Sequence, residues 1–226
     1  MSFLSATPLS HNVLRREVIA TAMRMNALGI NQGKSGNVSA RIADGFLITP
    51  TGVAYEETRP EQIVAMRMGG EFDGTTLPSS EWRFHRDIYA ARSDVCAIVH
   101  THAAYATTIA CMGEDIPAFH YMIAIAGGRD IRCAPYATFG TQALSDNAVT
   151  ALAERKACLL AQHGMIAVGV SLPEALALAV EVESLARMYW QLRQIGTPPL
   201  LDDVEMDIVI EKFKNYGQQA LNPPPA

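Results

Sequence analysis

The sequence lacks the features that mark several large functional classes of protein. Its formal net charge is −5 and no cluster of lysine and arginine stands out, so no surface for binding nucleic acid is predicted. No apolar run approaches the roughly 18 residues that a membrane-spanning helix needs. The first ten residues have neither a basic start nor a long apolar stretch, so no secretory signal is indicated. These absences favour a cytoplasmic protein without nucleic-acid or membrane partners.

Cysteine is also scarce. The 4 cysteines form no C-x-x-C pair, and reduced thiols in the cytosol are the simplest interpretation. No linker or internal repeat divides the chain, and 49% of its residues are hydrophobic. We therefore expect residues 1–226 to form a single globular domain.

Hydrophobic periodicity predicts an α/β fold. Apolar residues at spacings of three and four predict helices, and short apolar segments are typical of buried strands. The predicted helices cover residues 10–29, 79–92, 171–194 and 204–216. The predicted strands cover residues 46–49, 95–102, 131–134, 158–161 and 165–168. Strands interleaved with helices predict a sheet that is covered on both faces, although this pattern leaves the strand order open.

Histidines suggest a metal site. His100 and His102 stand two residues apart in a predicted strand, so both imidazoles should point to the same face. This pattern alone fits two metal ligands or an ordinary hydrogen-bonded pair equally well. His163 follows another apolar strand and precedes Gly164, where the chain is expected to turn. Three histidines with one open position match catalytic zinc sites. The remaining histidines are interpreted as surface, helix and loop residues: His11, His85 and His120.

A second polar group lies where the predicted helix 79–92 begins. Ser79 and Ser80 are typical helix caps, but free N–H groups at a helix start also attract anions. The loop 31–37 and the Thr51-Gly52 turn could add donors and complete a phosphate pocket. Glu81 is in the same segment. A carboxylate there is usually a favourable partner of the helix dipole, yet beside a metal it could transfer protons.

Eight short stretches, spread over nearly the whole chain, resemble the class II aldolase/adducin family. They are 36–39 (GNVS), 48–52 (ITPTG), 77–85 (LPSSEWRFH), 99–102 (VHTH), 120–123 (HYMI), 133–140 (CAPYATFG), 162–164 (QHG) and 211–217 (EKFKNYG). Within the family, they are most similar to aldolases that act on L-fuculose 1-phosphate. The resemblance implies a three-layer α/β/α sandwich with a mostly antiparallel central sheet.

The resemblance also implies a role for each site residue. Zinc would be held by His100, His102 and His163, with Mn²⁺ or Co²⁺ as possible substitutes, and Glu81 would be both a metal ligand and the acid/base. Phosphate would be bound by residues matching the family's phosphate site: Gly36, Asn37, Thr51, Gly52, Ser79 and Ser80. Tyr121 would enter a neighbouring subunit's site in a homotetramer. Phe139 and Tyr216 would close over the substrate, the latter from a tail formed by residues 204–226. Lys34 stands where the family more often has a small neutral residue; it could alter phosphate affinity or point to solvent, and we expect it to be solvated.

The reaction implied by the resemblance is reversible cleavage of a ketose 1-phosphate to dihydroxyacetone phosphate and L-lactaldehyde. The resemblance leaves the identity of the aldehyde product undecided, because relatives cleave 5-deoxyribulose 1-phosphate or 5-(methylthio)ribulose 1-phosphate. A pentulose-phosphate 4-epimerase, the dehydratase of methionine salvage and a non-catalytic adducin-like scaffold are alternatives within the fold. A lysine Schiff base is an alternative chemistry, although none of the chain's lysines lies in an apolar pocket sequence: Lys34, Lys156, Lys212 and Lys214.

Overall fold

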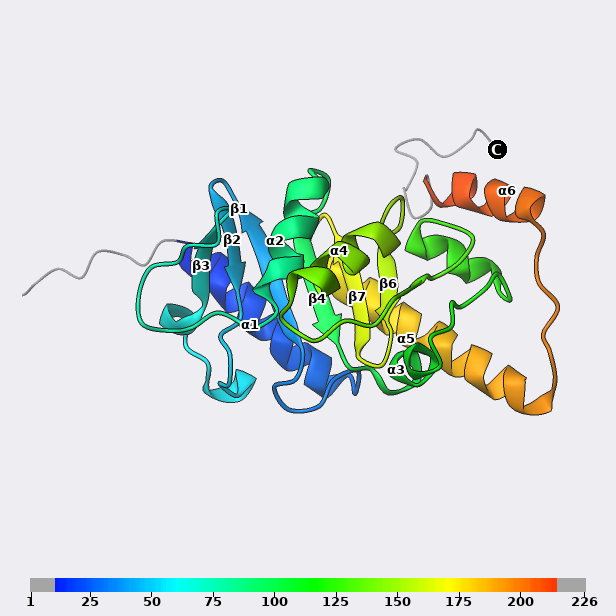
Figure 1. Ribbon diagram of the computed structural model, residues 1–226, viewed down its shortest axis with the longest axis horizontal. Helices are drawn as coiled ribbons and strands as arrows, with labels where there is room; N and C mark the ends of the chain where they lie inside the picture. The colour runs from blue at the N-terminus through cyan, green and yellow to red at the C-terminus, as the bar shows by residue number, and fades with distance from the viewer. Residues whose placement is uncertain (1–10, 215–226) are drawn as a thin grey trace, which may run out of the picture.

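The computed structural model describes residues 11–214, and structural statements below refer to that part of the chain. A seven-stranded sheet with the order β3-β2-β1-β4-β7-β6-β5 forms its centre (Figure 1). The strands are β1 (Asn37–Ile42), β2 (Gly45–Ile48), β3 (Val64–Arg67), β4 (Ala97–Thr101), β5 (Cys133–Ala134), β6 (Ala157–Leu160) and β7 (Gly164–Gly169). Neighbouring strands pair antiparallel, except β5 and β6, which are parallel. The predicted mostly antiparallel sheet is confirmed.

Helices cover both faces of the sheet. They are α1 (Asn12–Ala27), α2 (Trp82–Ala91), α3 (Ala104–Cys111), α4 (Gln142–Ala151), α5 (Leu172–Ile195) and α6 (Asp203–Phe213). Side chains alternate across each strand, and in β4 Val99 joins the core that includes α1, α3 and α5, while Ile98 joins the core of α2 and α4. Two cores separated by one sheet make a three-layer α/β/α sandwich, as predicted.

The longest helix, α5, follows the sequence signals closely. Ser171 caps it by accepting a hydrogen bond from the Glu174 N–H at 3.3 Å, and Pro173 occupies the first turn. The helix ends before Gly196. After it the chain loops around to α6, which lies apart from the sheet (Figure 1). No helix within residues 11–214 is both long and apolar enough to cross a membrane.

Among the α-helices and strands, four were not predicted: β1, β3, α3 and α4. The α3 sequence, AYATTIAC, mixes alanine and threonine on all sides, so its apolar periodicity is weak. β1 was missed for a different reason: its polar residues Asn37, Ser39 and Arg41 are typical of a loop or an exposed edge strand. In the structure β1 is an interior strand of the sheet. Its polar side chains hydrogen-bond to α2 or to the loop that follows α2.

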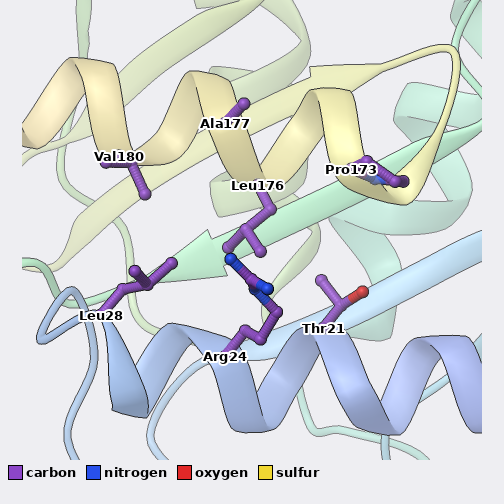
Figure 2. Close-up of a pocket in the computed structure, with 7 residues that line it drawn as sticks. All are labelled: Thr21, Arg24, Leu28, Pro173, Leu176, Ala177 and Val180. Atoms are coloured by element: carbon purple, nitrogen blue, oxygen red, sulfur yellow. The ribbon is translucent and has the colours of Figure 1, made fainter.

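A groove of about 510 Å³ separates α1 from α5 (Figure 2). Arg24 extends from α1 toward Leu176 on α5, and the other lining side chains are mostly apolar. The lining contains no carboxylate, histidine or cysteine. This groove therefore offers no acid–base or metal chemistry, which is concentrated elsewhere in the molecule.

Candidate active site

Three histidine side chains converge beside the central strands. His100 is the second-last residue of β4 and is fully buried, His102 directly follows that strand, and His163 lies in the turn between β6 and β7. Each offers one ring nitrogen, and these atoms all lie within 4.8 Å of one another. The ring centroids are 4.8 to 5.1 Å apart. The structure thus brings together the three histidines that the sequence singled out.

Hydrogen bonding fixes the orientation of His100. Its Nδ1 lies 2.9 Å from the backbone oxygen of Met165, which can only accept, so Nδ1 carries the proton. The lone pair of Nε2 then points into the cluster, as in a histidine that ligates a metal. Burial lowers the pKa of His102 to about 4, with His100 and His163 adding to the effect, so this imidazole is neutral near pH 7.

Glu81 completes the cluster from the start of α2. Its carboxylate is buried, with Oε2 3.1 Å from His100 Nε2 and Oε1 3.1 Å from His163 Nε2. Burial by itself would raise the pKa of this carboxyl, but His100 and His163 outweigh burial and hold the pKa well below its usual range. Asn37 donates a hydrogen bond from Nδ2 to Oε2 at 2.9 Å. Glu81 is therefore an ionised carboxylate that faces the imidazoles of His100 and His163.

Several of these buried atoms have no hydrogen-bond partner. They are Oε1 of Glu81, Nε2 of His100 and Nε2 of His102. Buried polar atoms without partners are costly and need an explanation. Imidazole nitrogens and a carboxylate oxygen that face one another form a donor set for a divalent cation, and imidazoles with an ionised carboxylate suit Zn²⁺.

The turn before β7, which carries His163, is formed by a different residue from the one that the sequence predicted. Gly164 was expected to turn the chain, but the residue in the left-handed region is Gln162, with φ 52°. Gly164 serves close packing instead. A Cβ there would lie 2.7 Å from the backbone oxygen of Thr101 and 2.9 Å from Cδ2 of His102. Glycine at this position therefore lets β7 approach the end of β4 and His102, which follows it.

We expect Gly164→Ala to destabilise the protein by about 1–3 kcal/mol, because the added methyl overpacks β4. The displaced His102 should also weaken zinc binding. Thermal unfolding with and without added zinc measures both effects. Unchanged unfolding temperature and unchanged zinc content would show that the close approach of β7 does not matter.

The predicted phosphate-binding segments lie next to one another. The Ser79 N–H donates to the Thr49 oxygen at 3.0 Å, and the Thr51 N–H donates to the Leu77 oxygen at 3.1 Å. Lys34 is exposed as expected, but its Nζ donates to the Gly52 oxygen at 2.8 Å and so joins the loop 31–37 to this pair of segments. These bonds therefore hold the loop 31–37, the Thr51-Gly52 turn and the segment before α2 together.

The residues predicted to bind phosphate differ in their exposure and in the hydrogen bonds that they already make. Gly36 is buried and its oxygen accepts from the Tyr55 hydroxyl, while Ser79 is buried and its Oγ accepts from the Glu81 N–H at 3.3 Å. Ser80, Thr51 and Gly52 are exposed. The Asn37 side chain contacts Glu81 and His85, so a phosphate contact of this residue would have to come from its backbone.

One pocket of about 270 Å³ opens onto the cluster. Its lining consists of Ser35, Ser80, Glu81, His102, Tyr136, Ala137, Phe139, Gln162 and His163. Phe139 is 65% exposed and Tyr136 is 60% exposed, so two aromatic rings line the pocket yet stay open to solvent. Phe139 was predicted as a site residue, but Tyr136 and Gln162 were not, although all three lie within the motifs 133–140 and 162–164.

The structure places Tyr121 beside a different cavity. Tyr121 is 51% exposed and lines a separate cavity, where its ring stacks on Phe213 at 6.5 Å. It does not line the pocket of its own chain. Tyr216 lies outside the described residues, as does most of the predicted tail. The fold of one chain therefore does not bring Tyr121 to Glu81.

Comparison with known proteins decides the family. Residues 16–190 match the family described as the Class II Aldolase and Adducin N-terminal domain. The chain belongs to this family. It is 54% identical, over 96% of its length and 99% of the relative's, to a 5-methylthioribulose-1-phosphate/5-deoxyribulose-1-phosphate aldolase of Rhodospirillum rubrum. It is 50% identical, over 92% of its length and 98% of the relative's, to the L-fuculose phosphate aldolase of Escherichia coli.

Solved structures agree with this assignment. An L-fuculose 1-phosphate aldolase superposes with a TM-score of 0.89 and 39% identity, covering 92% of this chain and all of the other. This class II aldolase is therefore an enzyme of the lyase class. Its four lysines, Lys34, Lys156, Lys212 and Lys214, are all exposed, and none lines the three-histidine pocket. The pocket thus offers no lysine for a Schiff base and supplies a metal donor set instead.

Proposed function

We propose that this class II aldolase binds zinc through His100, His102 and His163, with Glu81 as a further ligand, and reversibly cleaves a ketose 1-phosphate. The products would be dihydroxyacetone phosphate and a short aldehyde. The observation that carries this proposal is the convergence of unpartnered imidazole nitrogens and an ionised carboxylate at one pocket. Mn²⁺ or Co²⁺ could replace zinc, because nitrogen and carboxylate ligands suit these ions too.

The chemistry assigns a proton-transfer role to Glu81. Breaking the C3–C4 bond leaves an electron pair on C3, delocalised toward the C2 oxygen. When bound, zinc supplies a Lewis acid that stabilises this negative charge. In the synthetic direction, ionised Glu81 removes a proton from C3 of dihydroxyacetone phosphate, and in cleavage the same carboxyl returns it. Glu81 is the carboxylate that lines this pocket.

The second proton belongs to the C4 hydroxyl of the substrate. We infer that Tyr121 of a neighbouring subunit takes this proton, within a homotetramer. Its ring is exposed and it is not among the residues that line its own chain's pocket, and both facts support this inference. A solution mass equal to one subunit, with full activity retained, would refute a shared site.

The phosphate of the substrate would bind where the loop 31–37, Thr51-Gly52 and the start of α2 meet. Hydroxyl and N–H donors of Ser79, Ser80, Thr51, Gly52 and Gly36, with the backbone of Asn37, would surround it. Lys34 is held at the same place by its bond to the Gly52 oxygen.

We expect Lys34→Ala to raise KM for the sugar phosphate by up to about fivefold with little change in kcat, because an exposed charge contributes at most about 1 kcal/mol. The difference should shrink at high salt. Steady-state kinetics at two salt concentrations measure this effect. Lys156→Ala removes an exposed lysine that pairs with Glu174 and serves as the control. Equal KM values for both variants would place Lys34 outside the phosphate site.

Two substrate types are compatible with the site. L-Fuculose 1-phosphate is favoured by the motif similarity and the superposed structure, whereas the Rhodospirillum rubrum relative favours 5-(methylthio)ribulose or 5-deoxyribulose 1-phosphate. These compounds share the phosphate end and differ beyond C4. Tyr136 and Phe139 give the pocket an aromatic side that suits the methyl or methylthio ends of all three.

The experiment compares kcat/KM for the three phosphates with zinc-loaded protein, while dihydroxyacetone phosphate is measured by enzymatic reduction. We expect release from at least one compound, loss of release after chelation and recovery with zinc. Borohydride should trap no covalent adduct. Release from none of the three, or interconversion of pentulose phosphates without release, would contradict the proposal. Protein that binds no zinc would instead favour the scaffold alternative.

A further inference from the structure

Polar side chains line the buried contact between β1 and α2. Asn37 and Ser39 lie two residues apart on β1 and so share the face that packs against α2. His85 and Tyr89 lie four residues apart on α2 and face β1 together. All four are at most 2% exposed. Polar groups buried this deeply destabilise a core unless each finds a partner, so their arrangement calls for a functional reason.

These side chains form one continuous hydrogen-bonded chain that ends at Glu81. The Tyr89 hydroxyl lies 2.8 Å from Ser39 Oγ, which lies 2.7 Å from His85 Nδ1. His85 Nε2 lies 2.5 Å from Asn37 Oδ1, and Asn37 Nδ2 lies 2.9 Å from Glu81 Oε2. Apart from its contacts with the histidines, the Glu81 carboxylate receives this one hydrogen bond within residues 11–214.

The charge of Glu81 fixes the direction of every bond in the chain. An ionised carboxylate only accepts, so Asn37 must turn its NH₂ group toward Glu81 and its oxygen toward His85. His85 therefore carries its proton on Nε2 and accepts from the Ser39 hydroxyl at Nδ1. Ser39 in turn accepts from Tyr89. Burial lowers the pKa of His85 to about 3 and raises the pKa of Tyr89, which agrees with a neutral imidazole and a protonated phenol.

We propose that His85 is a positioning residue for Glu81, because its Nε2–H holds the Asn37 amide in the orientation that donates to the carboxylate. Without this donor, the amide can rotate and turn its oxygen toward Glu81, which repels it. The carboxylate then loses the bond that fixes Oε2 opposite His100. His85 does not line the pocket, so it acts through Asn37 and not on the substrate. The inference rests on the proposed function, since it assumes that Glu81 transfers the proton.

The test compares substitutions that keep or remove the Nε2–H. His85→Gln places an amide N–H near the position of Nε2, whereas His85→Asn reaches only the Ser39 side and His85→Leu has no donor. We expect His85→Leu and His85→Asn to keep zinc and KM while lowering kcat about 10- to 100-fold, as when a ligand loses its hydrogen-bonding partner. His85→Gln should recover most of kcat. The two amide variants keep the comparison valid if His85→Leu does not fold.

Two further measurements separate positioning from a merely structural role. In a double-mutant cycle, the loss from His85→Asn should largely disappear in an Asn37→Ala background, because both changes remove the same bond. The visible absorption of Co²⁺-loaded protein, recorded without substrate, should change in His85→Asn and return toward the wild type in His85→Gln. Additive losses, or identical cobalt spectra for all variants, would overturn the proposal. Because the spectra need no turnover, they test His85 even if the proposed reaction fails.

Discussion

Replacing Glu81 by glutamine is expected to lower kcat for release of dihydroxyacetone phosphate by about 10²- to 10⁴-fold, the usual contribution of a positioned proton-transfer group. Glutamine has the same shape and keeps an oxygen that can face the histidines, but it cannot accept and return a proton. The variant should therefore still bind zinc. The loss should appear in kcat more than in KM, because the phosphate-binding segments are unchanged.

The matching experiment measures kcat at saturating substrate and zinc per chain on the same samples. Glu57→Gln is the control, since Glu57 is exposed and lies outside the pocket. A near-normal rate in Glu81→Gln would remove Glu81 from proton transfer. A large loss of zinc would show that Glu81 acts mainly as a ligand.

Replacing His100 by alanine is expected to reduce cleavage to the level of the metal-free protein. His100 is fully buried, its Nδ1 is bonded to the Met165 oxygen, and its Nε2 points into the cluster without a hydrogen-bond partner. Loss of a ligand's outer hydrogen-bonding partner typically costs 10- to 100-fold in metal affinity, so loss of the ligand itself should cost more than about 100-fold.

Competition with a coloured chelator measures the zinc affinity of His100→Ala, and thermal unfolding checks that the variant folds. His11→Ala is the matched control, because His11 is exposed and precedes α1, far along the chain from the cluster. Zinc affinity equal to that of the wild type would mean that the metal binds elsewhere.

The sequence predicted the parts of the fold that local pattern determines. α5 has a serine cap, a proline in the first turn and a closing glycine, and all three signals acted as expected. β1 and α3 were missed because their character depends on tertiary contacts. Asn37 and Ser39 make β1 look exposed, and only the packing of α2 over the strand shows that their polar atoms are buried and paired.

Some residues of the site could likewise be predicted from local pattern, whereas others depend on tertiary contacts. His100 and His102 could be paired from their spacing on a strand, and His163 could be named from its own strand end, but the structure shows that this distant turn meets the other two histidines. His85 was interpreted as an ordinary helix residue, because nothing in its local sequence shows the hydrogen bonds to Ser39 and Asn37. The role of Tyr121 stays a prediction, since it depends on a second subunit.

The most direct test of the account is a titration of metal-free protein with zinc while release of dihydroxyacetone phosphate is followed. We predict no release at the start, a linear rise and a sharp break at one zinc per chain. Cleavage at the full rate before any zinc is added would contradict the central claim that a metal ion held by three histidines stabilises the charge created when the carbon–carbon bond breaks.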